Sequence, residues 1–269
     1  MVLPELYLSI HATFMQIYAY LLRIRAGGNK KIRTVQGHLA CPEATLKMPP
    51  GRRFRIRPCA MKILDVHTHR GETANEQSVI SLTPYEYLES KPVGPFSIGI
   101  HPWGTVSDPE AQFSVLKEIL SHAEPVAVGE CGLDALRGAD MDTQLDFLTR
   151  QTDLATEAGL PVILHVVKKF DEIIKLRRRY GASQQFLVHG FRGNPQQAMQ
   201  LIRNNIRISF GMHFNPMTIQ AIPLQDLLFE TDGKCTIDEV VEAASATLGI
   251  PENSLRTIAF ENAGIFFKQ

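Results

Sequence analysis

The chain has 269 residues, 28 Lys and Arg against 28 Asp and Glu, and 44% apolar residues. That is enough for one large or two small domains with a sizeable core. Residues 1–60 hold ten of the basic and two of the acidic residues, so the rest of the chain is net acidic. This imbalance predicts a basic appendage on an acidic globular domain, and it excludes a main domain that holds nucleic acid by a broad positive surface.

The first 60 residues predict a poorly ordered basic extension, because they show no sustained period of two or 3.6. The apolar stretch at residues 3–22 is interrupted by Glu5, His11 and Gln16. It therefore predicts neither a membrane-spanning helix nor a signal peptide. At Met61 the irregular basic sequence gives way to a pattern typical of a strand. One hypothesis is that the native chain starts there.

From residue 61 to residue 269, short apolar runs alternate with longer helical patterns, which is typical of βα units around a parallel sheet. The predicted strands are residues 62–67, 78–82, 96–100, 126–129, 161–165, 186–189, 206–209 and 226–230. The predicted helices are residues 108–122, 142–158, 169–180, 195–204 and 236–248, with shorter connections after the second and seventh strands. Eight such units in about 209 residues predict a compact (βα)8 TIM barrel.

The four Cys residues show neither a CxxC motif nor the spacing of a disulfide framework. A reducing, cytoplasmic location is therefore expected. We also expect a monomer that makes no contact with membranes.

Polar residues lie at the ends of the predicted strands. Asp65, His67 and His69 alternate along the first strand, so their side chains share one face. The other strand ends carry His101, Glu130, His165, His189 and Asp232. The carboxyl ends of barrel strands meet at one rim, where barrels build their active sites.

Each of these residues has a structural explanation when taken alone. A single His at a strand end is more often a hydrogen-bonded structural group, and Asp232 could cap a turn. Four His and two carboxylates on one rim are costly to bury unless they are paired or bind metal. Six ligand-type residues could hold two divalent ions with a carboxylate such as Glu130 between them, whereas one ion would use three or four ligands.

Seven motifs, taken in order, resemble those of the TatD family of metal-dependent hydrolases and deoxyribonucleases. They are Asp65-Val-His-Thr-His69, Gly99-Ile-His-Pro-Trp103, Gly129-Glu-Cys-Gly-Leu-Asp134, Pro161-Val-Ile-Leu-His165, His189-Gly-Phe-Arg-Gly193, Ile208-Ser-Phe-Gly211 and Glu230-Thr-Asp232. The resemblance covers residues 61–269 and implies a TIM barrel with a dinuclear metal centre. The metal ligands it implies are His67, His69, Glu130, His165, His189 and Asp232. His101 matches a family active-site His that is not usually a ligand.

The resemblance implies a phosphodiesterase that acts on DNA ends or short oligonucleotides, with two divalent ions (Mg, Mn or Zn) generating a hydroxide that attacks phosphorus. Glu130, Asp232 and His101 are the expected catalytic residues. Asp232 would accept a proton, and His101 would hydrogen-bond the phosphate or the leaving oxygen. The partner would be a DNA end or a small phosphoester.

Four further residues are candidate substrate contacts: Lys168, Arg192, Lys234 and Trp103. Alternatively, the Lys and Arg side chains are solvated surface charges, and Trp103 packs the rim of the barrel. The loops after the fifth and eighth strands are short or altered relative to the family pattern, so the sequence resembles a loop-trimmed member. The alternative activity is hydrolysis of a small ester, lactone or amide. A non-catalytic metal- or nucleic-acid-binding protein is less favoured, because it gives no reason for the six ligand-type residues.

Overall fold

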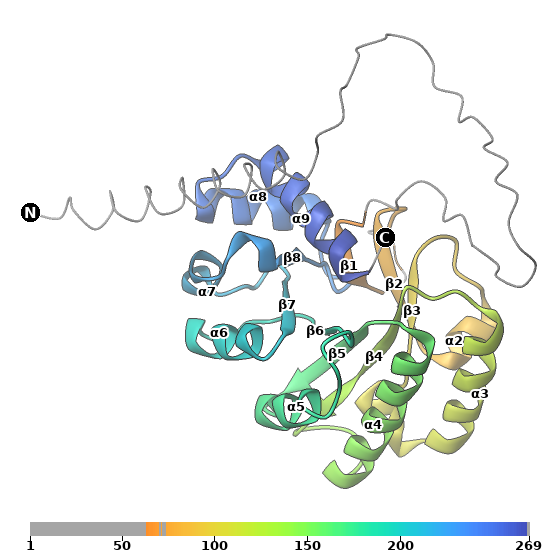
Figure 1. Cartoon of the computed structure of the whole chain (residues 1–269). Helices are drawn as coiled ribbons and strands as arrows, with labels where there is room; N and C mark the ends of the chain where they lie inside the picture. Colours follow the sequence, from red (N-terminus) through yellow and green to blue (C-terminus); the bar gives the residue numbers. More distant parts are fainter. Residues whose placement is uncertain (1–62, 70, 72–73, 268–269) are drawn as a thin grey trace, which may run out of the picture. The chain divides into compact units, whose positions relative to one another are not determined.

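A computed structural model of the chain describes residues 63–69, 71 and 74–267. The predicted extension, residues 1–60, and the apolar stretch within it lie outside these residues. Eight parallel strands form a closed barrel in sequence order, and β1 pairs with β8 to close it (Figure 1). The strands are β1 (Asp65–Thr68), β2 (Ser78–Leu82), β3 (Phe96–Ile98), β4 (Ala127–Asp134), β5 (Val162–Val167), β6 (Phe186–Val188), β7 (Ile206–Phe210) and β8 (Leu227–Phe229). The predicted (βα)8 barrel is confirmed.

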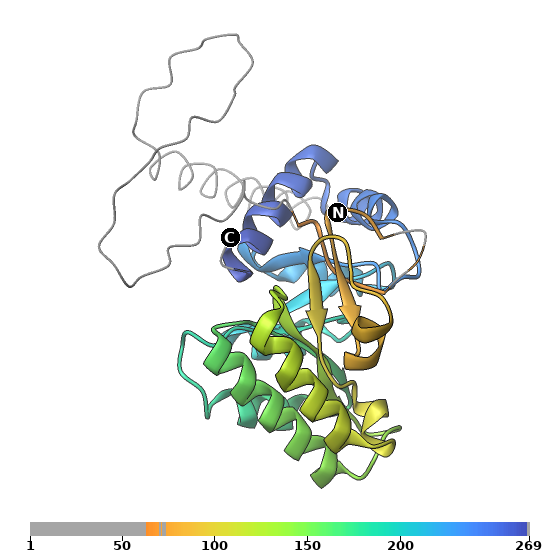
Figure 2. The same ribbon diagram turned by 90° about the vertical axis from the view of Figure 1, so that its right-hand side faces the viewer.

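Helices follow the strands and cover the outside of the barrel; α3 and α4 lie side by side in Figure 2. The α-helices are α2 (Pro84–Glu89), α3 (Pro109–His122), α4 (Met141–Ala158), α5 (Phe170–Arg177), α6 (Pro195–Arg203), α7 (Pro216–Ala221), α8 (Ile237–Leu248) and α9 (Glu252–Phe266), and the 3-10 helices are η1 (Pro102–Val106) and η2 (Leu224–Asp226). The sequence signals for helix ends work as expected. Thr236 and Glu239 form a capping box, and Asn194 caps α6.

Strand β4 is longer than predicted, since it runs to Asp134 rather than ending at residue 129. Its second half pairs with β5 from Cys131 onward, after an irregularity in the register. The two backbones approach closely there, because Gly132 has a φ of 151° and a Cβ atom at this position would collide with the backbone of His165. Glu130 therefore lies within a strand rather than after it.

The predicted helix at residues 169–180 ends early, at Arg177. The Arg177 guanidinium is buried and donates to the carbonyl oxygens of Tyr180 and Asn205. These bonds stabilise the turn that follows the helix, so the role of Arg177 is structural.

Helix α9 was not predicted. Its Ala263 and Phe266, together with Phe267, form one hydrophobic cluster with buried residues of β1, β2, β4, β5, β6 and β8. Within this cluster, Ile63 precedes β1 and Ala127 is the first residue of β4. Helix α9 thus packs toward the amino-terminal end of the barrel, which leaves the carboxyl-terminal rim for the polar residues.

In the described part of the chain, no helix combines the length and the apolar character that a membrane span requires.

Candidate metal centre

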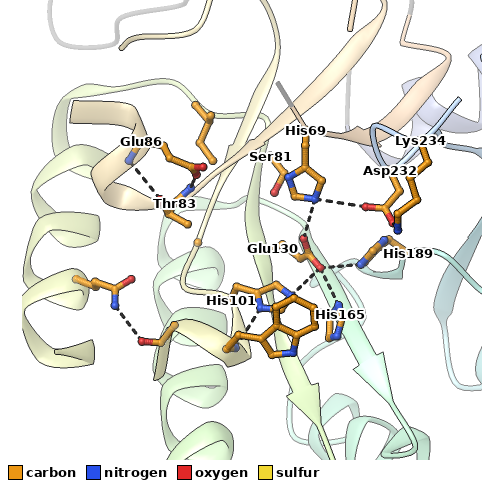
Figure 3. Close-up of a pocket in the computed structure, with 15 residues that line it drawn as sticks. His69, Ser81, Thr83, Glu86, His101, Glu130, His165, His189, Asp232 and Lys234 are labelled. Atoms are coloured by element: carbon orange, nitrogen blue, oxygen red, sulfur yellow. Dashed lines mark hydrogen bonds and ion pairs between the residues drawn. The ribbon is translucent and has the colours of Figure 1, made fainter. Parts of the chain in front are cut away.

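The barrel brings together all the predicted ligand residues. His67 lies in β1, Glu130 in β4 and His165 in β5. The remaining ones follow strand ends within a few residues: His69, His189 and Asp232. Figure 3 shows His69, His165 and His189 pointing toward Glu130, with Asp232 beside His69.

Glu130 is the centre of the cluster, and its two carboxylate oxygens face different His residues. Oε2 lies 3.4 Å from His67 Nε2 and 3.6 Å from His69 Nε2. Oε1 lies near three imidazoles: His101 Nε2 at 3.2 Å, His165 Nδ1 at 2.9 Å and His189 Nε2 at 2.8 Å. The buried carboxylate thus separates the imidazoles into two groups.

Asp232 extends the first of these groups. Its Oδ1 lies 3.3 Å from His69 Nε2 and 3.8 Å from His67 Nε2, and its other oxygen forms an ion pair with Lys234. The residue has a left-handed φ of 52°, which is uncommon outside glycine. The preceding Thr231 is anchored by Asp65, which accepts its backbone N–H at 3.0 Å and its hydroxyl at 2.7 Å. Asp65 therefore fixes the loop that presents Asp232.

The electrostatics of the cluster favour charged carboxylates. Burial opposes ionisation of Glu130, but His189 and His67 outweigh it and hold the pKa of Glu130 well below its usual range. Burial likewise disfavours charge on His189, yet Glu130 and Glu230 raise the pKa of His189 well above its ordinary value. Burial lowers the pKa of His67, and the neighbouring His189 acts in the same direction. The carboxylates are thus ionised and available to a cation.

The residues present fit a divalent metal. His67 is fully buried, yet neither of its ring nitrogens makes a hydrogen bond. Five imidazoles surround Glu130, although a carboxylate has only about four lone-pair sites. Such unsatisfied buried groups are costly unless a cation coordinates them.

Three sets of side chains place their ligand atoms within 4.8 Å of one another: His67, His69 and Asp232; His67, Glu130 and His189; and His101, Glu130 and His165. The mixture of imidazole and carboxylate ligands suits Zn, Mn and related divalent ions. His101, which the sequence placed beside the metals, belongs to one of these sets. It also caps η1, since its Nδ1 accepts the backbone N–H of Trp103 at 3.1 Å.

Two supporting carboxylates received no role from the sequence. Asp134 lies 3.3 Å from His165 Nε2 and accepts the indole N–H of Trp103 at 2.6 Å. Glu230 lies 3.4 Å from His189 Nδ1 and accepts the Ser209 hydroxyl at 2.6 Å. Both contact the ring nitrogen that faces away from the nearest Glu130 oxygen, which is how outer carboxylates orient metal-binding His residues. Their positions inside the recognised motifs, at the end of Gly129–Asp134 and at the start of Glu230–Asp232, were the only sequence signal.

Two cavities adjoin the cluster. The larger, of about 540 Å³, is lined by the His cluster, by Trp103 and by Lys234; the smaller, of about 260 Å³, is lined by Arg192 and Lys234 among others. Lys168 lines neither of them. Trp103 is 43% exposed, and the guanidinium of Arg137 lies over its ring at 4.7 Å. Three of the four predicted substrate contacts therefore lie beside the cluster.

The chain is similar in sequence to several known proteins. The metal-dependent hydrolase YabD of Bacillus subtilis is 30% identical over 148 residues, which is 51% of this chain and 57% of YabD. YjjV of Escherichia coli is 33% identical over 147 residues, or 51% of this chain and 56% of YjjV. The 3'-5' ssDNA/RNA exonuclease TatD of Yersinia pseudotuberculosis is 29% identical over 145 residues, or 50% and 55% of the two chains. The matches thus span somewhat more than half the length of these relatives.

Solved structures agree on the fold. The crystal structure of Escherichia coli YjjV has a TM-score of 0.65 at 24% identity, covering 78% of this chain and 100% of YjjV. A TatD-family hydrolase from Entamoeba histolytica has a TM-score of 0.59 at 15% identity, covering 77% and 98%.

The sequence profile described as TatD related DNase matches residues 78–268. The match begins after β1, so His67 and His69 join the site on their geometry and not on the profile. With most of the barrel inside the match, the chain belongs to the TatD-related DNase family.

Proposed function

We propose that the chain is a divalent-metal-dependent phosphodiesterase that acts on DNA ends or short oligonucleotides. The observation that carries this proposal is the position of Glu130, whose two oxygens face separate groups of imidazoles. A carboxylate placed in this way could contact two cations, one through each oxygen. The names of the relatives, which include a single-strand exonuclease, support a nucleic-acid substrate.

His67, His69 and Asp232 would hold one ion, His165 and His189 the other, and Glu130 both. When bound, such ions lower the pKa of water and offset the negative charge of a phosphodiester. Their charge also explains how a net acidic domain could take an anionic substrate.

Residues of the chain itself would then accept and donate the protons of the reaction. In hydrolysis, a water oxygen forms a bond to phosphorus while the bond from phosphorus to one ester oxygen breaks. Asp232 is placed to accept the water proton, because it is ionised: burial opposes this, but hydrogen bonds from His69 and Lys234 lower its pKa. His101, at the edge of the larger cavity, would donate a hydrogen bond to the phosphate or to the leaving oxygen, which needs a proton as it departs.

The test follows release of nucleotides from end-labelled single-stranded DNA with Mg, Mn or Zn, beside a Glu130→Gln variant. The variant keeps the shape of the side chain but loses the charge between the two imidazole groups. Metal-dependent release that the variant lacks is the expected result. A wild-type protein that binds metal but releases nothing would eliminate DNA as substrate, and small esters, lactones and amides would be assayed next.

A further inference from the structure

We propose that the smaller cavity binds the phosphate next to the scissile one, while the larger cavity takes the terminal nucleoside. This inference rests on the proposed phosphodiesterase function and specifies its substrate: an oligonucleotide of at least two phosphates, bound by its end.

The two cavities share a border. Asp232 and Lys234 line both of them, while Glu130 and His165 line the larger and Arg192 the smaller. A phosphodiester placed at Glu130 and Asp232 therefore has space on both sides. One strand of an oligonucleotide can pass from the first cavity into the second without crossing the barrel wall.

The larger cavity is unsuitable for a second phosphate. Beyond the His cluster its lining includes Leu82, Trp103 and the carboxylate of Glu86, and Lys234 at the border is its only Lys or Arg among the described residues. Glu86 caps α2 by accepting the backbone N–H of Thr83 at 2.7 Å. Figure 3 shows Thr83 and Glu86 on one side of His69, and Asp232 and Lys234 on the other. The partly apolar surface of this cavity suits the base and sugar of a terminal residue.

The smaller cavity has the opposite character. The three acidic residues in its lining are already engaged: Glu230 with Ser209 and His189, Asp232 with His69 and Lys234, and Glu239 with the cap of α8. Arg192 and His213 are exposed in the lining and have no hydrogen bond or ion pair within the described part of the chain. The uncommitted groups of this cavity are thus N–H donors, including one guanidinium, and a guanidinium matches a phosphate geometrically.

This division of charge orients the substrate. A strand end carries a nucleoside with no phosphate beyond it, which fits beside Glu86, and the following phosphates lie toward Arg192. An internal segment would place a phosphate against Glu86, in a cavity whose lining, among the described residues, has Lys234 as its one Lys or Arg. The geometry therefore favours removal of terminal residues over internal cleavage.

The experiment compares two substrates with one phosphate, bis(4-nitrophenyl) phosphate and the dinucleotide TpT, with the trinucleotide TpTpT, which has two. Wild-type protein is assayed beside Arg192→Gln. A matched control is Arg203→Gln, which removes the same charge from an exposed position on α6 that lines neither cavity. We expect Arg192→Gln to lower kcat/KM for TpTpT roughly fivefold more than for the two substrates with one phosphate, since only TpTpT reaches the second cavity. Arg203→Gln should not change this ratio.

A second readout does not depend on turnover. Trp103 is the only Trp in the chain and lines the larger cavity, so its fluorescence reports binding of a phosphorothioate analogue of TpTpT. Arg192→Gln should raise the Kd and reduce the salt dependence by about one counterion, whereas the fluorescence change at saturation should stay the same.

Equal losses on all three substrates, or an effect of Arg203→Gln as large as that of Arg192→Gln, would overturn the second-cavity assignment. Absence of hydrolysis of all three substrates with every metal would instead overturn the proposed function. The fluorescence titration then decides the assignment separately: an unchanged Kd in Arg192→Gln rejects it.

Discussion

Replacing Asp134 by Asn should weaken metal binding without altering any ligand. Asp134 is only 3% exposed, and both of its oxygens accept hydrogen bonds. Oδ1 accepts the backbone N–H groups of Leu136 and Arg137 at 2.8 and 3.2 Å, and Oδ2 faces Trp103 Nε1 at 2.6 Å and His165 Nε2 at 3.3 Å. An Asn side chain has only one acceptor oxygen. Its NH2 group, a donor, would therefore face either the two backbone N–H groups or the side of Trp103 and His165.

The size of the effect follows from this geometry. Because the backbone donors hold the one remaining oxygen, the amide nitrogen would face His165, and the ring would lose the contact that keeps Nδ1 directed at Glu130. Loss of such an outer carboxylate typically costs 10- to 100-fold in metal affinity, which is about 1.4–2.7 kcal/mol.

The assay is competition for Zn against a chromophoric chelator, with thermal unfolding used to confirm that the variant is folded. Asp142→Asn is the matched control, since it makes the same change on the exposed first turn of α4. A folded Asp134→Asn protein that binds Zn within twofold of wild type would show that Asp134 does not support the metal site.

Three further predictions concern stability. At a metal concentration 100 times the Kd, metal binding contributes about 2.7 kcal/mol to the free energy of unfolding. Removing the metal with a chelator should therefore lower the Tm by several degrees, and an unchanged Tm would contradict this. Phe266→Ala should cost about 3–5 kcal/mol of unfolding free energy in urea because Phe266 is buried at the base of the barrel, whereas Ile265→Ala on the exposed side of α9 should cost little. Burial raises the pKa of Asp65 to about 7; the hydrogen bonds from Thr231 oppose this shift, and the charge of Glu230 adds to it. Between the unfolded and folded pKa values, the folded state therefore retains a proton that the unfolded state has lost. The contribution of Asp65 to the stability of metal-free protein should therefore fall as the pH rises from about 4 to about 7, by at most about 1.4 kcal/mol per pH unit, and the difference in stability between wild type and Asp65→Asn should show this slope.

Much of the barrel could be predicted because its strands are short, apolar and separated by helices with explicit caps. All eight predicted strands are present, and the capping signals at Asn194 and Thr236 mark helices. The site could be predicted as a cluster because parallel strands place their carboxyl ends on one rim. Alternation along β1 was enough to pair His67 with His69 before any distance was known.

The rest depended on tertiary structure. Helix α9 was missed, although Leu255, Ile258, Ala259, Asn262, Ala263 and Phe266 are buried at helical spacing. The roles of Asp134 and Glu230 are set by which ring nitrogen of a distant His they reach, which sequence spacing does not specify. Arg192 could be named as a candidate contact, but its cavity forms only when the loops after β6, β7 and β8 come together.

The monomeric state and the cytoplasmic location stay predictions, as does the division of the chain at residue 60.

We propose that Glu130 lies between two divalent ions, and elemental analysis of purified protein counts these ions. Wild-type protein and Glu130→Gln would be equilibrated with the same metal, freed of excess and measured for ions per chain. We predict two divalent ions in wild type and the loss of at least one in the variant, with both proteins folded. A wild-type chain that retains no divalent ion, or a variant that retains two, would show that Glu130 does not hold two ions.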